Sequence, residues 1–379
     1  MNNPFQYGGI VAEDAFCDRQ KELGDLLAAM RNGEKLFMYS ERRMGKTSLV
    51  RRAMDRLPSG AYLSAYIDLW PTDGESSFAA AAAKSIAESM ASTADKLLET
   101  AKSLFGRLVP ALTTDDEGKP QITFGASRYG RPGPELDEVI EAPARIAARR
   151  NRKVVIVFDE FQRVLEYEND LVERKIRSAI QKHRRVAYIF LGSRKHLIQK
   201  MVLDQSRPLY RAGGHYSLGP ISVEAWAPFI QKRFAASGRK ITRDRIDDIC
   251  ELTGGHPFYT QHLCHSLWEI CRPGRPISDE LIQQALRILL DREAYAYTSL
   301  WESLTLNHRR LLKGLAIEPE SAEVFGSDFI FRYGLRTPSN AQRAVDSLLQ
   351  RDIIDRQNGS FVIMDRFFRL WIRKSQDLK

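Results

Sequence analysis

The chain has 379 residues, of which 57 are Lys or Arg and 48 are Asp or Glu, so its formal net charge is +9. This length, with 43% hydrophobic residues, predicts an ordinary globular chain of two or three domains. No apolar run approaches the about eighteen residues of a membrane span, which argues against a membrane protein. The excess of basic residues suits nucleic acid or another polyanion but does not demand one.

The four cysteines are widely spaced and form no C-x-x-C pair. They are Cys17, Cys250, Cys264 and Cys271. The N-terminus lacks the basic and then apolar pattern of a signal peptide. We therefore expect free thiols in a reducing cytoplasm. We also expect that the chain does not bind a membrane by itself and that a membrane role would need a partner protein.

The first elements in chain order are a helix, a strand and a loop that leads into a second helix. Spaced apolar residues predict a helix that follows Asp18 as its N-cap. A strand is expected at 36–39, and helical spacing resumes after Thr47. A strand that delivers backbone N–H groups to a helix N-terminus is the layout of a phosphate-binding loop.

The residue types in this loop fit a nucleoside triphosphate with Mg²⁺. Gly45 lets the backbone approach the phosphates, Lys46 supplies a cation to the β- and γ-phosphates, and the Thr47 hydroxyl is a Mg²⁺ ligand. The whole nucleotide-binding loop is expected to comprise Arg43, Met44, Gly45, Lys46, Thr47 and Ser48. The triplet Gly-Lys-Thr alone is weak evidence because it is frequent by chance, so the surrounding chain must support it.

The first position of the loop departs from the pattern G-x-x-x-x-G-K-[ST], because Ser40 stands where glycine is expected. If the φ angle of Ser40 were positive, the serine would cost about 1 kcal/mol and weaken nucleotide binding.

The next elements continue an α/β pattern. A strand is expected at 61–70, helices at 75–110, a polar stretch with a short hairpin at 113–134, and a helix at 135–150. The basic cluster at the end of that helix is typical of a solvated helix end more often than of a binding surface.

A second informative place is the continuous apolar run of residues 154–158, which is followed by Asp159 and Glu160. Such a run predicts a strand that is buried on both faces in a parallel sheet. Ligands of parallel sheets bind outside the carboxyl ends of the strands. We therefore expect Asp159 to hold Mg²⁺ and Glu160 to orient and deprotonate the attacking water. The structural alternative is that Asp159 caps the next element.

A third buried strand is expected at 185–193 and a further one at 216–221. Ser193 lies at the end of the third strand, where a polar sensor of the γ-phosphate or of the attacking water would belong. It also suits the cap of the following helix, and the two roles are compatible.

From residue 223 the pattern becomes helical, with helices expected at 223–237, 243–252, 257–271 and 278–294. Further on, three helices precede an Asn-Gly turn between two short apolar runs, which predicts a winged helix-turn-helix. Its third helix carries Arg343 but also Asp346, and residues 292–379 hold 14 Lys or Arg against 11 Asp or Glu. Docking to a protein is therefore at least as well supported as DNA reading.

These motifs together resemble the prokaryotic "archaeal ATPase" group of STAND NTPases, which are relatives of AAA+ proteins. The resemblance extends over nearly the whole length. It rests on Asn3-Pro4-Phe5, Phe16-x-x-Arg19-x-x-Glu22-Leu23, Arg42-Arg43-Met44-Gly45-Lys46-Thr47, Phe158-Asp159-Glu160-Phe161-Gln162, Gly192-Ser193, Gly255-His256-Pro257 and Asp365–Trp371.

The resemblance implies an α/β fold: a P-loop three-layer α/β/α core with a parallel sheet, then a helical lid and a winged-helix domain. The expected bounds are 1–221 for the ATPase core, 222–296 for the lid and 297–379 for the winged helix. It also implies that Phe16 and Arg19 lie along the adenine and that Pro257 presses the lid against the base. Either Arg207 or Arg211 would reach the γ-phosphate, in cis or from a neighbouring copy, and Arg211 is our first candidate.

The function we expect is a cytoplasmic, ATP-hydrolysing molecular switch with slow turnover, which needs Mg²⁺ and binds ATP and ADP. The lid would relay the nucleotide state to the winged helix, which would engage a protein partner or DNA. One alternative is a DNA-binding protein that ATP licenses, similar in role to replication or transposition regulators. Another is a nucleotide-binding scaffold without turnover. A homo-oligomer is compatible with all three.

Overall fold

The structure is a computed structural model, which describes residues 2–9, 16–91, 96–114, 120–125, 133–319, 321–357 and 359–375. The chain divides into two compact units. The sheet unit comprises Arg19–Arg42 and Lys46–Leu218. The helical unit comprises Met1–Asp18, Arg43–Gly45 and Gly219–Lys379. Each unit has its own hydrophobic core.

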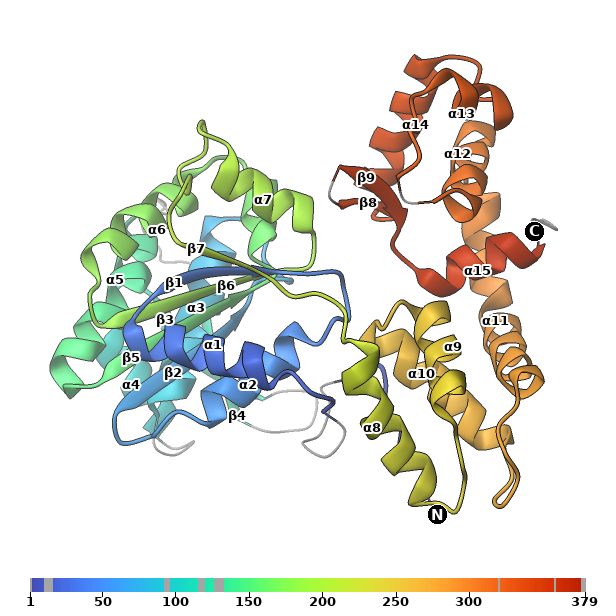
Figure 1. Cartoon of the computed structure of the whole chain (residues 1–379). Coiled ribbons are helices and arrows are strands. Elements are labelled where there is room, and N and C mark those ends of the chain that lie inside the picture. Colours follow the sequence, from blue (N-terminus) through green and yellow to red (C-terminus); the bar gives the residue numbers. More distant parts are fainter. Residues whose placement is uncertain are drawn as a thin grey trace. The chain divides into compact units, whose positions relative to one another are not determined.

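A parallel sheet of five strands forms the centre of the sheet unit, in the order β2-β5-β6-β1-β7 (Figure 1). The strands are β1 Lys35–Tyr39, β2 Tyr62–Asp68, β5 Lys153–Asp159, β6 Val186–Gly192 and β7 Gly214–Ser217. β5 and β6 are buried almost throughout, as their continuous apolar sequences predict. β7 both begins and ends earlier than the expected strand 216–221, and its pairing with β1 stops before Pro220, which has no N–H to donate to a ladder.

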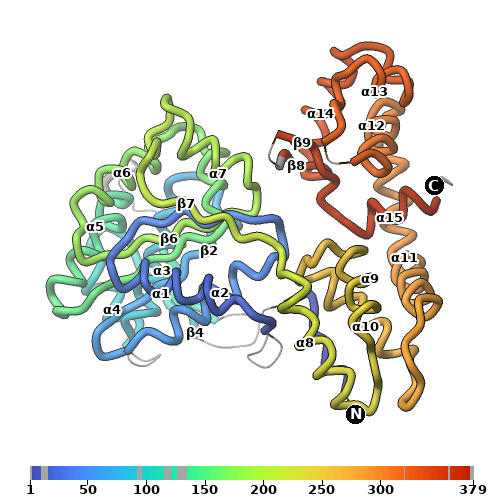
Figure 2. The backbone as a smooth tube through the Cα atoms, in the orientation of Figure 1, coloured from blue at the N-terminus to red at the C-terminus, as the bar shows by residue number. Residues whose placement is uncertain are grey.

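Helices pack on both faces of this sheet, which gives three layers (Figures 1 and 2). These helices are α1 Gln20–Asn32, α2 Lys46–Asp55, α3 Glu75–Met90, α4 Leu97–Leu104, α5 Gly133–Arg150, α6 Leu171–Lys182 and α7 Lys195–Leu203, with a 3-10 helix, η3 Phe161–Glu166. The expected α/β/α core is therefore present.

The start of α1 differs from the prediction that Asp18 caps it. Asp18 and Arg19 both have left-handed backbone, with φ angles of 53° and 70°, and the N-cap is Arg19 without a side-chain cap bond. A capping aspartate needs extended backbone at its own position, so Asp18 cannot serve.

A short antiparallel hairpin pairs β3 Val109–Thr114 with β4 Pro120–Gly125. It overlaps the predicted polar stretch 113–134 but begins earlier, at the end of the region 75–110 that was expected to be helical. The rest of that stretch, 115–119 and 126–132, lies outside the described residues.

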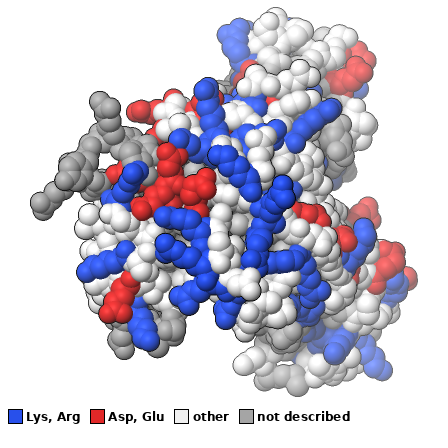
Figure 3. Space-filling view, turned by 90° about the vertical axis from the view of Figure 1, so that its left-hand side faces the viewer, with Lys and Arg blue, Asp and Glu red and all other residues white. Residues whose placement is uncertain are grey.

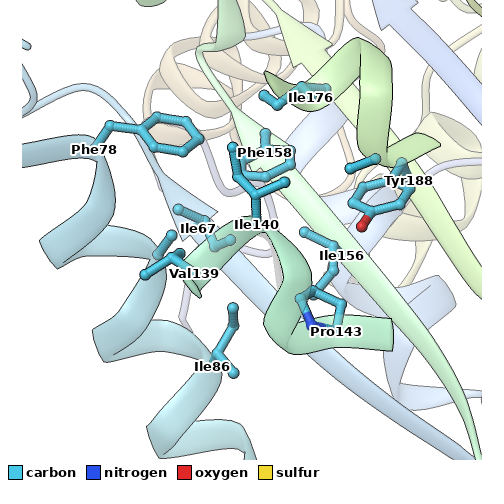
Figure 4. A pocket seen from close by; sticks show the side chains of 12 residues that line it. Ile67, Phe78, Ile86, Val139, Ile140, Pro143, Ile156, Phe158, Ile176 and Tyr188 are labelled. Atoms are coloured by element: carbon cyan, nitrogen blue, oxygen red, sulfur yellow. The ribbon is translucent and has the colours of Figure 1, made fainter. Parts of the chain in front are cut away.

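A small apolar cavity of ≈ 10 Å³ lies between the sheet and helices α3, α5 and α6 (Figure 4). Among its lining residues are Phe78, Val139, Phe158 and Ile176. The volume is at the lower limit for one water molecule, about 10–15 Å³, and the lining offers a water no polar partners. We therefore regard it as a packing void and not a ligand site.

The helical unit begins with helices that the sequence placed in a lid and ends with a winged helix-turn-helix. Its elements are α8 Val223–Ala235, α9 Arg243–Thr253, α10 Pro257–Ile270, α11 Asp279–Glu302, α12 Leu306–Ile317, α13 Ser327–Arg332, α14 Pro338–Gln350, β8 Ile354–Gln357, β9 Ser360–Ile363 and α15 Arg366–Ser375. The predicted hairpin is present as β8 and β9, although Asn358 of its turn lies outside the described residues.

α11 is longer than expected, since it runs unbroken from Asp279 to Glu302. Residue 296, where the sequence placed the end of the lid, is thus inside one helix. Within the described ranges, no helix combines the length and apolarity that crossing a membrane requires.

Candidate nucleotide-binding site

Five of the predicted site residues, Lys46, Thr47, Asp159, Glu160 and Ser193, lie together at the carboxyl edge of the sheet. β1 ends at Tyr39, β5 at Asp159 and β6 at Gly192, and the register pairs Tyr39 with Gly192. β6 lies between the other two strands, so the loop after β1 and the acids after β5 flank Ser193, which follows β6. This edge is where parallel sheets bind ligands.

The loop after β1 has its left-handed backbone at Arg43 (φ 59°) and Gly45 (φ 87°), and not at Ser40. The strain that we considered for Ser40 therefore does not arise. The Ser40 hydroxyl is buried, donates to the carbonyl of Glu41 over 2.8 Å and accepts from Lys46 Nζ over 2.9 Å. The serine thus holds the lysine that the motif needs.

Lys46 is the first residue of α2 and is 6% exposed. Its ammonium also donates to the carbonyls of Glu41, over 3.1 Å, and Ser40, over 3.4 Å. Burial lowers the pKa of Lys46 to about 8, and the nearby Glu160 and Asp159 carboxylates partly oppose this shift. A buried cation at the N-terminus of a helix is well suited to an anionic ligand.

Asp159 and Thr47 face each other across the site, with Thr47 Oγ1 3.2 Å from Asp159 Oδ2. Tyr66, on β2, also donates its hydroxyl to Asp159 Oδ2 and lies 3.4 Å from Thr47 Oγ1. The other oxygen, Oδ1, accepts from the Glu160 N–H over 2.9 Å. Burial raises the pKa of Asp159, and these hydrogen bonds limit the rise.

This donor set fits Mg²⁺ bound in the usual manner of phosphate-transfer sites. One hydroxyl and one carboxylate oxygen from the protein leave the remaining positions for phosphate oxygens and water, as Mg²⁺ prefers. No cluster of three or more His, Cys, Asp or Glu that could hold a metal occurs in the described part of the chain. Thr47 and Asp159 are accordingly the residues that would hold the ion.

Glu160 has a left-handed backbone (φ 52°) at the start of the 3-10 helix η3. Its Oε2 accepts from Ser193 Oγ over 2.7 Å and from the amide of Gln162. The Gln162 amide is also 3.4 Å from Ser193 Oγ. The three side chains form one hydrogen-bonded cluster, and Ser193 and Gln162 are both buried.

The two arginines after β6 have different surroundings. Arg207 forms an ion pair with Glu173, which is fully buried. The Cζ of Arg211 lies 5.2 Å from the centroid of the Tyr210 ring, and its φ angle is 49°. The charge of Arg207 is already engaged. Arg211 precedes β7, whose Gly214 pairs with Leu36 near the start of β1, so it lies toward the amino ends of the strands, away from Lys46 and Asp159. Of the two possibilities that we considered, in cis or from a neighbouring copy, only the second suits Arg211.

The residues proposed for the base are divided between the units. Phe16 and Pro257 belong to the helical unit, where Pro257 is the first residue of α10. Arg19 belongs to the sheet unit and forms an ion pair with Glu22 over 2.8 Å. Of the remaining loop residues, Met44 and Ser48 are buried.

Sequence reasoning assigned no role to Tyr66 or Gln162. Tyr66 lies on β2, paired with Val157, and only the parallel register shows that it reaches Asp159. The only hint of Gln162 in the sequence is its place two residues after Glu160. Its hydrogen bond to Glu160 depends on the left-handed backbone of Glu160, which the sequence did not predict.

A family model described as "ATPase domain predominantly from Archaea" matches residues 16–263, about two thirds of the chain. This chain belongs to that ATPase family. A second model, described as "Probable winged helix domain", matches residues 295–374 of this archaeal-type ATPase. The family that the sequence motifs indicated is confirmed, as is the C-terminal winged helix.

Solved structures share the fold of this archaeal-type ATPase. A Walker-type ATPase of Pyrococcus abyssi is 15% identical with a TM-score of 0.63, over 95% of this chain and 97% of that one. The ORC2 protein of Aeropyrum pernix, solved as ADPNP–ADP complexes, is 12% identical with a TM-score of 0.52, over 99% and 100%. The predicted P-loop α/β fold is thereby confirmed. No curated protein matches the chain significantly.

Proposed function

We propose that this protein is a molecular switch that binds MgATP and hydrolyses it slowly. The observation that carries the proposal is the grouping of Lys46, Thr47, Asp159, Glu160 and Ser193 at one edge of the sheet. ATPase family membership supports the same reaction.

The chemistry assigns one task to each side chain. Lys46 leaves its serine and carbonyl partners to neutralise the β- and γ-phosphates, and Arg211 of a neighbouring copy would add a second cation. Thr47 and Asp159 would hold Mg²⁺, which would supply charge neutralisation for the phosphates. Glu160 accepts a proton from the attacking water, while Ser193 keeps the Glu160 carboxylate in place.

Contacts inside the helical unit support a relay from the lid to the winged helix. The Tyr259 ring of α10 lies 4.9 Å from the Phe367 ring of α15, edge to face. A Cβ on Gly254, which ends α9, would meet the Arg366 guanidinium at 2.4 Å. α10 begins at Pro257 and packs against α15. An adenine base that contacts Pro257 would therefore press on a helix that is in contact with the winged-helix domain.

The partner engaged by the winged helix is a protein in this proposal, because α14 exposes Asp346 as well as Arg343. DNA binding licensed by ATP is the second candidate, and the winged-helix match supports it. The four free cysteines, three of them buried, support a reducing cytoplasmic compartment.

The test is phosphate release by Glu160→Gln, measured beside ATP binding. We expect binding to persist and turnover to fall at least a hundredfold, roughly the contribution of a general base. Glu168→Gln, at an exposed glutamate eight residues further on, is the matched control and should turn over normally. Unchanged hydrolysis in Glu160→Gln would refute the mechanism. Retained nucleotide with no turnover in the wild-type protein would instead support a scaffold.

A further inference from the structure

The amino ends of the strands carry a concentration of basic residues, at the edge of the sheet opposite the proposed ATP site. Three turns, α1–β1, α5–β5 and α6–β6, meet there because the strands are parallel neighbours or lie one strand apart. We call this surface the basic edge. It comprises Arg31, Lys35, Arg149, Arg150, Arg152, Lys153, Lys182, Arg184 and Arg185.

The basic edge is nearly free of acids. Its segments 31–35, 149–153 and 182–185 contain nine Lys or Arg and a single acid, Glu34. No salt bridge joins any of the nine to an acid within the described ranges. In Figure 3, which faces this side of the sheet unit, many blue side chains lie across the middle of the view, next to a cluster of red ones.

Hydrogen bonds hold the three turns in fixed positions. Lys35 Nζ donates to the carbonyl of Gly33 over 2.8 Å and to that of His183 over 3.2 Å. Lys153 Nζ donates to the carbonyl of Arg31 over 2.7 Å. The turns therefore present the remaining cations as one preformed surface.

A purely structural explanation covers only part of the basic edge. Cations in the last turn of a helix stabilise its dipole, and this accounts for residues such as Arg149, Arg150 and Lys182. Arg152, Arg184 and Arg185 lie two or three residues beyond the helix ends. Arg185 also has a structural contact, since its Nη1 donates to Asn151 Oδ1 over 3.0 Å. The described part of the chain gives no such contact for Arg152 or Arg184, so these structural reasons leave part of the charge unexplained.

We propose that the basic edge binds the phosphate backbone of duplex nucleic acid without reading its sequence. Six of the nine cations are arginines, whose planar guanidinium groups bind phosphate oxygens in pairs. The three segments contain no Phe, Tyr, Trp, Leu, Ile, Val or Met. They therefore lack the aromatic platforms of single-strand binding and the apolar anchors of membrane binding.

This site goes beyond the proposed switch, because it lies at the edge of the sheet opposite the ATP-binding edge and belongs to the sheet unit, whereas the winged helix belongs to the helical unit. The two proposals fail separately. Loss of ATP turnover in Glu160→Gln says nothing about the basic edge, and a basic-edge variant should hydrolyse ATP at the normal rate.

The test measures binding of the full chain to a 30-base-pair duplex of arbitrary sequence by fluorescence anisotropy at several salt concentrations. The variant is Arg149→Glu/Arg150→Glu/Arg184→Glu. We expect at least a roughly tenfold weaker affinity, and a salt dependence of log K against log salt that is smaller by about 3. Lys232→Glu/Arg272→Glu/Arg275→Glu, which reverses three exposed cations of the helical unit, is the control for net charge.

Several results would overturn the proposal. These are duplex binding that the basic-edge variant retains, equal weakening by the control variant, and wild-type binding to phosphatidylserine vesicles but not to duplex. Loss of binding in Arg343→Glu alone would place the interface on the winged helix. The milder Arg149→Gln/Arg150→Gln/Arg184→Gln variant, with ATP turnover as a measure of folding, separates lost binding from lost structure.

Discussion

The Ser40 hydroxyl oxygen lies 2.9 Å from the Lys46 ammonium and accepts its hydrogen bond inside the phosphate loop. A glycine at this position would leave the buried cation with backbone carbonyls alone. The departure from the usual loop pattern therefore gives the unliganded protein an extra acceptor for its lysine, at a position whose φ angle a serine adopts without strain.

Replacing Ser40 with Ala should destabilise the unliganded protein and tighten ATP binding. A hydrogen bond to a charged group contributes about 1.5 kcal/mol, and Lys46 gives this bond up when it moves to the phosphates. We expect the free energy of unfolding to fall by about that amount and the affinity for ATP to rise about tenfold. Urea unfolding and calorimetric titration measure the two quantities.

Ser40→Gly is the companion variant for this prediction. It also lacks the hydroxyl, and because the φ angle at residue 40 is not positive, its ATP affinity should match that of Ser40→Ala. Weaker ATP binding in both variants would show that the hydroxyl contacts the bound nucleotide instead.

ATP affinity should fall as the pH rises from 7 to 9. Burial lowers the pKa of Lys46 to about 8, well under its value in the unfolded chain. Because the pKa is lower in the folded protein than the ordinary 10.5, the charged lysine lowers the free energy of unfolding by its full amount below about pH 8. This loss disappears as the pH rises from 8 to 10.5, where the lysine is neutral in the folded protein. Phosphate binding needs the charged form, so the affinity should drop about tenfold over this range.

The measurement is the dissociation constant of MgATP across that pH range. Lys46→Arg is the control, since a guanidinium stays charged and should give a flat profile even if its affinity is lower. A flat profile in the wild-type protein would contradict the assignment of Lys46.

Tyr66→Phe should move the acid limb of the ATPase pH profile to higher pH. The Tyr66 hydroxyl donates to Asp159 Oδ2 and stabilises the ionised carboxylate, so its loss raises the pKa of Asp159 further. Protonated Asp159 cannot hold Mg²⁺. As the pH is lowered, the variant should therefore lose its ATPase activity at a higher pH than the wild type does.

Tyr62→Phe is the matched control for this change, because Tyr62 lies at the opposite end of the same strand. Its pH profile should equal that of the wild type. If the two variants gave identical profiles, the Tyr66–Asp159 bond would have no part in metal binding.

Gly255→Ala should destabilise the protein more than Gly254→Ala. Both glycines have positive φ angles, 65° and 61°, which costs an alanine about 1 kcal/mol. At Gly254 the added Cβ meets the end of the flexible Arg366 side chain, which can move away. At Gly255 it meets the Ile221 carbonyl oxygen at 2.3 Å, and the backbone cannot yield without cost.

Urea denaturation of the two alanine variants measures this difference. We expect the free energy of unfolding to fall by about 1 kcal/mol for Gly254→Ala and by about 3 kcal/mol or more for Gly255→Ala. Equal losses would mean that the chain from Pro220 to Ser222 shifts freely, and that the turn is not clamped against α8.

The local sequence determined the elements and much of the site's composition. A continuous apolar run followed by two acids is a buried strand ending at a parallel-sheet edge, and β5 with Asp159 and Glu160 matches it. The Gly-Lys-Thr triplet likewise marks the start of a helix, since α2 begins at Lys46. Such features are readable because burial periodicity and helix starts depend on residues near one another in the chain.

Only the tertiary structure decided which side chains meet. The register of β2 against β5 brings Tyr66 to Asp159, and the left-handed turn at Glu160 brings Gln162 and Ser193 to its carboxylate. The engagement of Arg207 by Glu173, and the meeting of three basic turns at one edge, also follow from strand order. These partners are far apart in sequence, so no local pattern encodes their contacts.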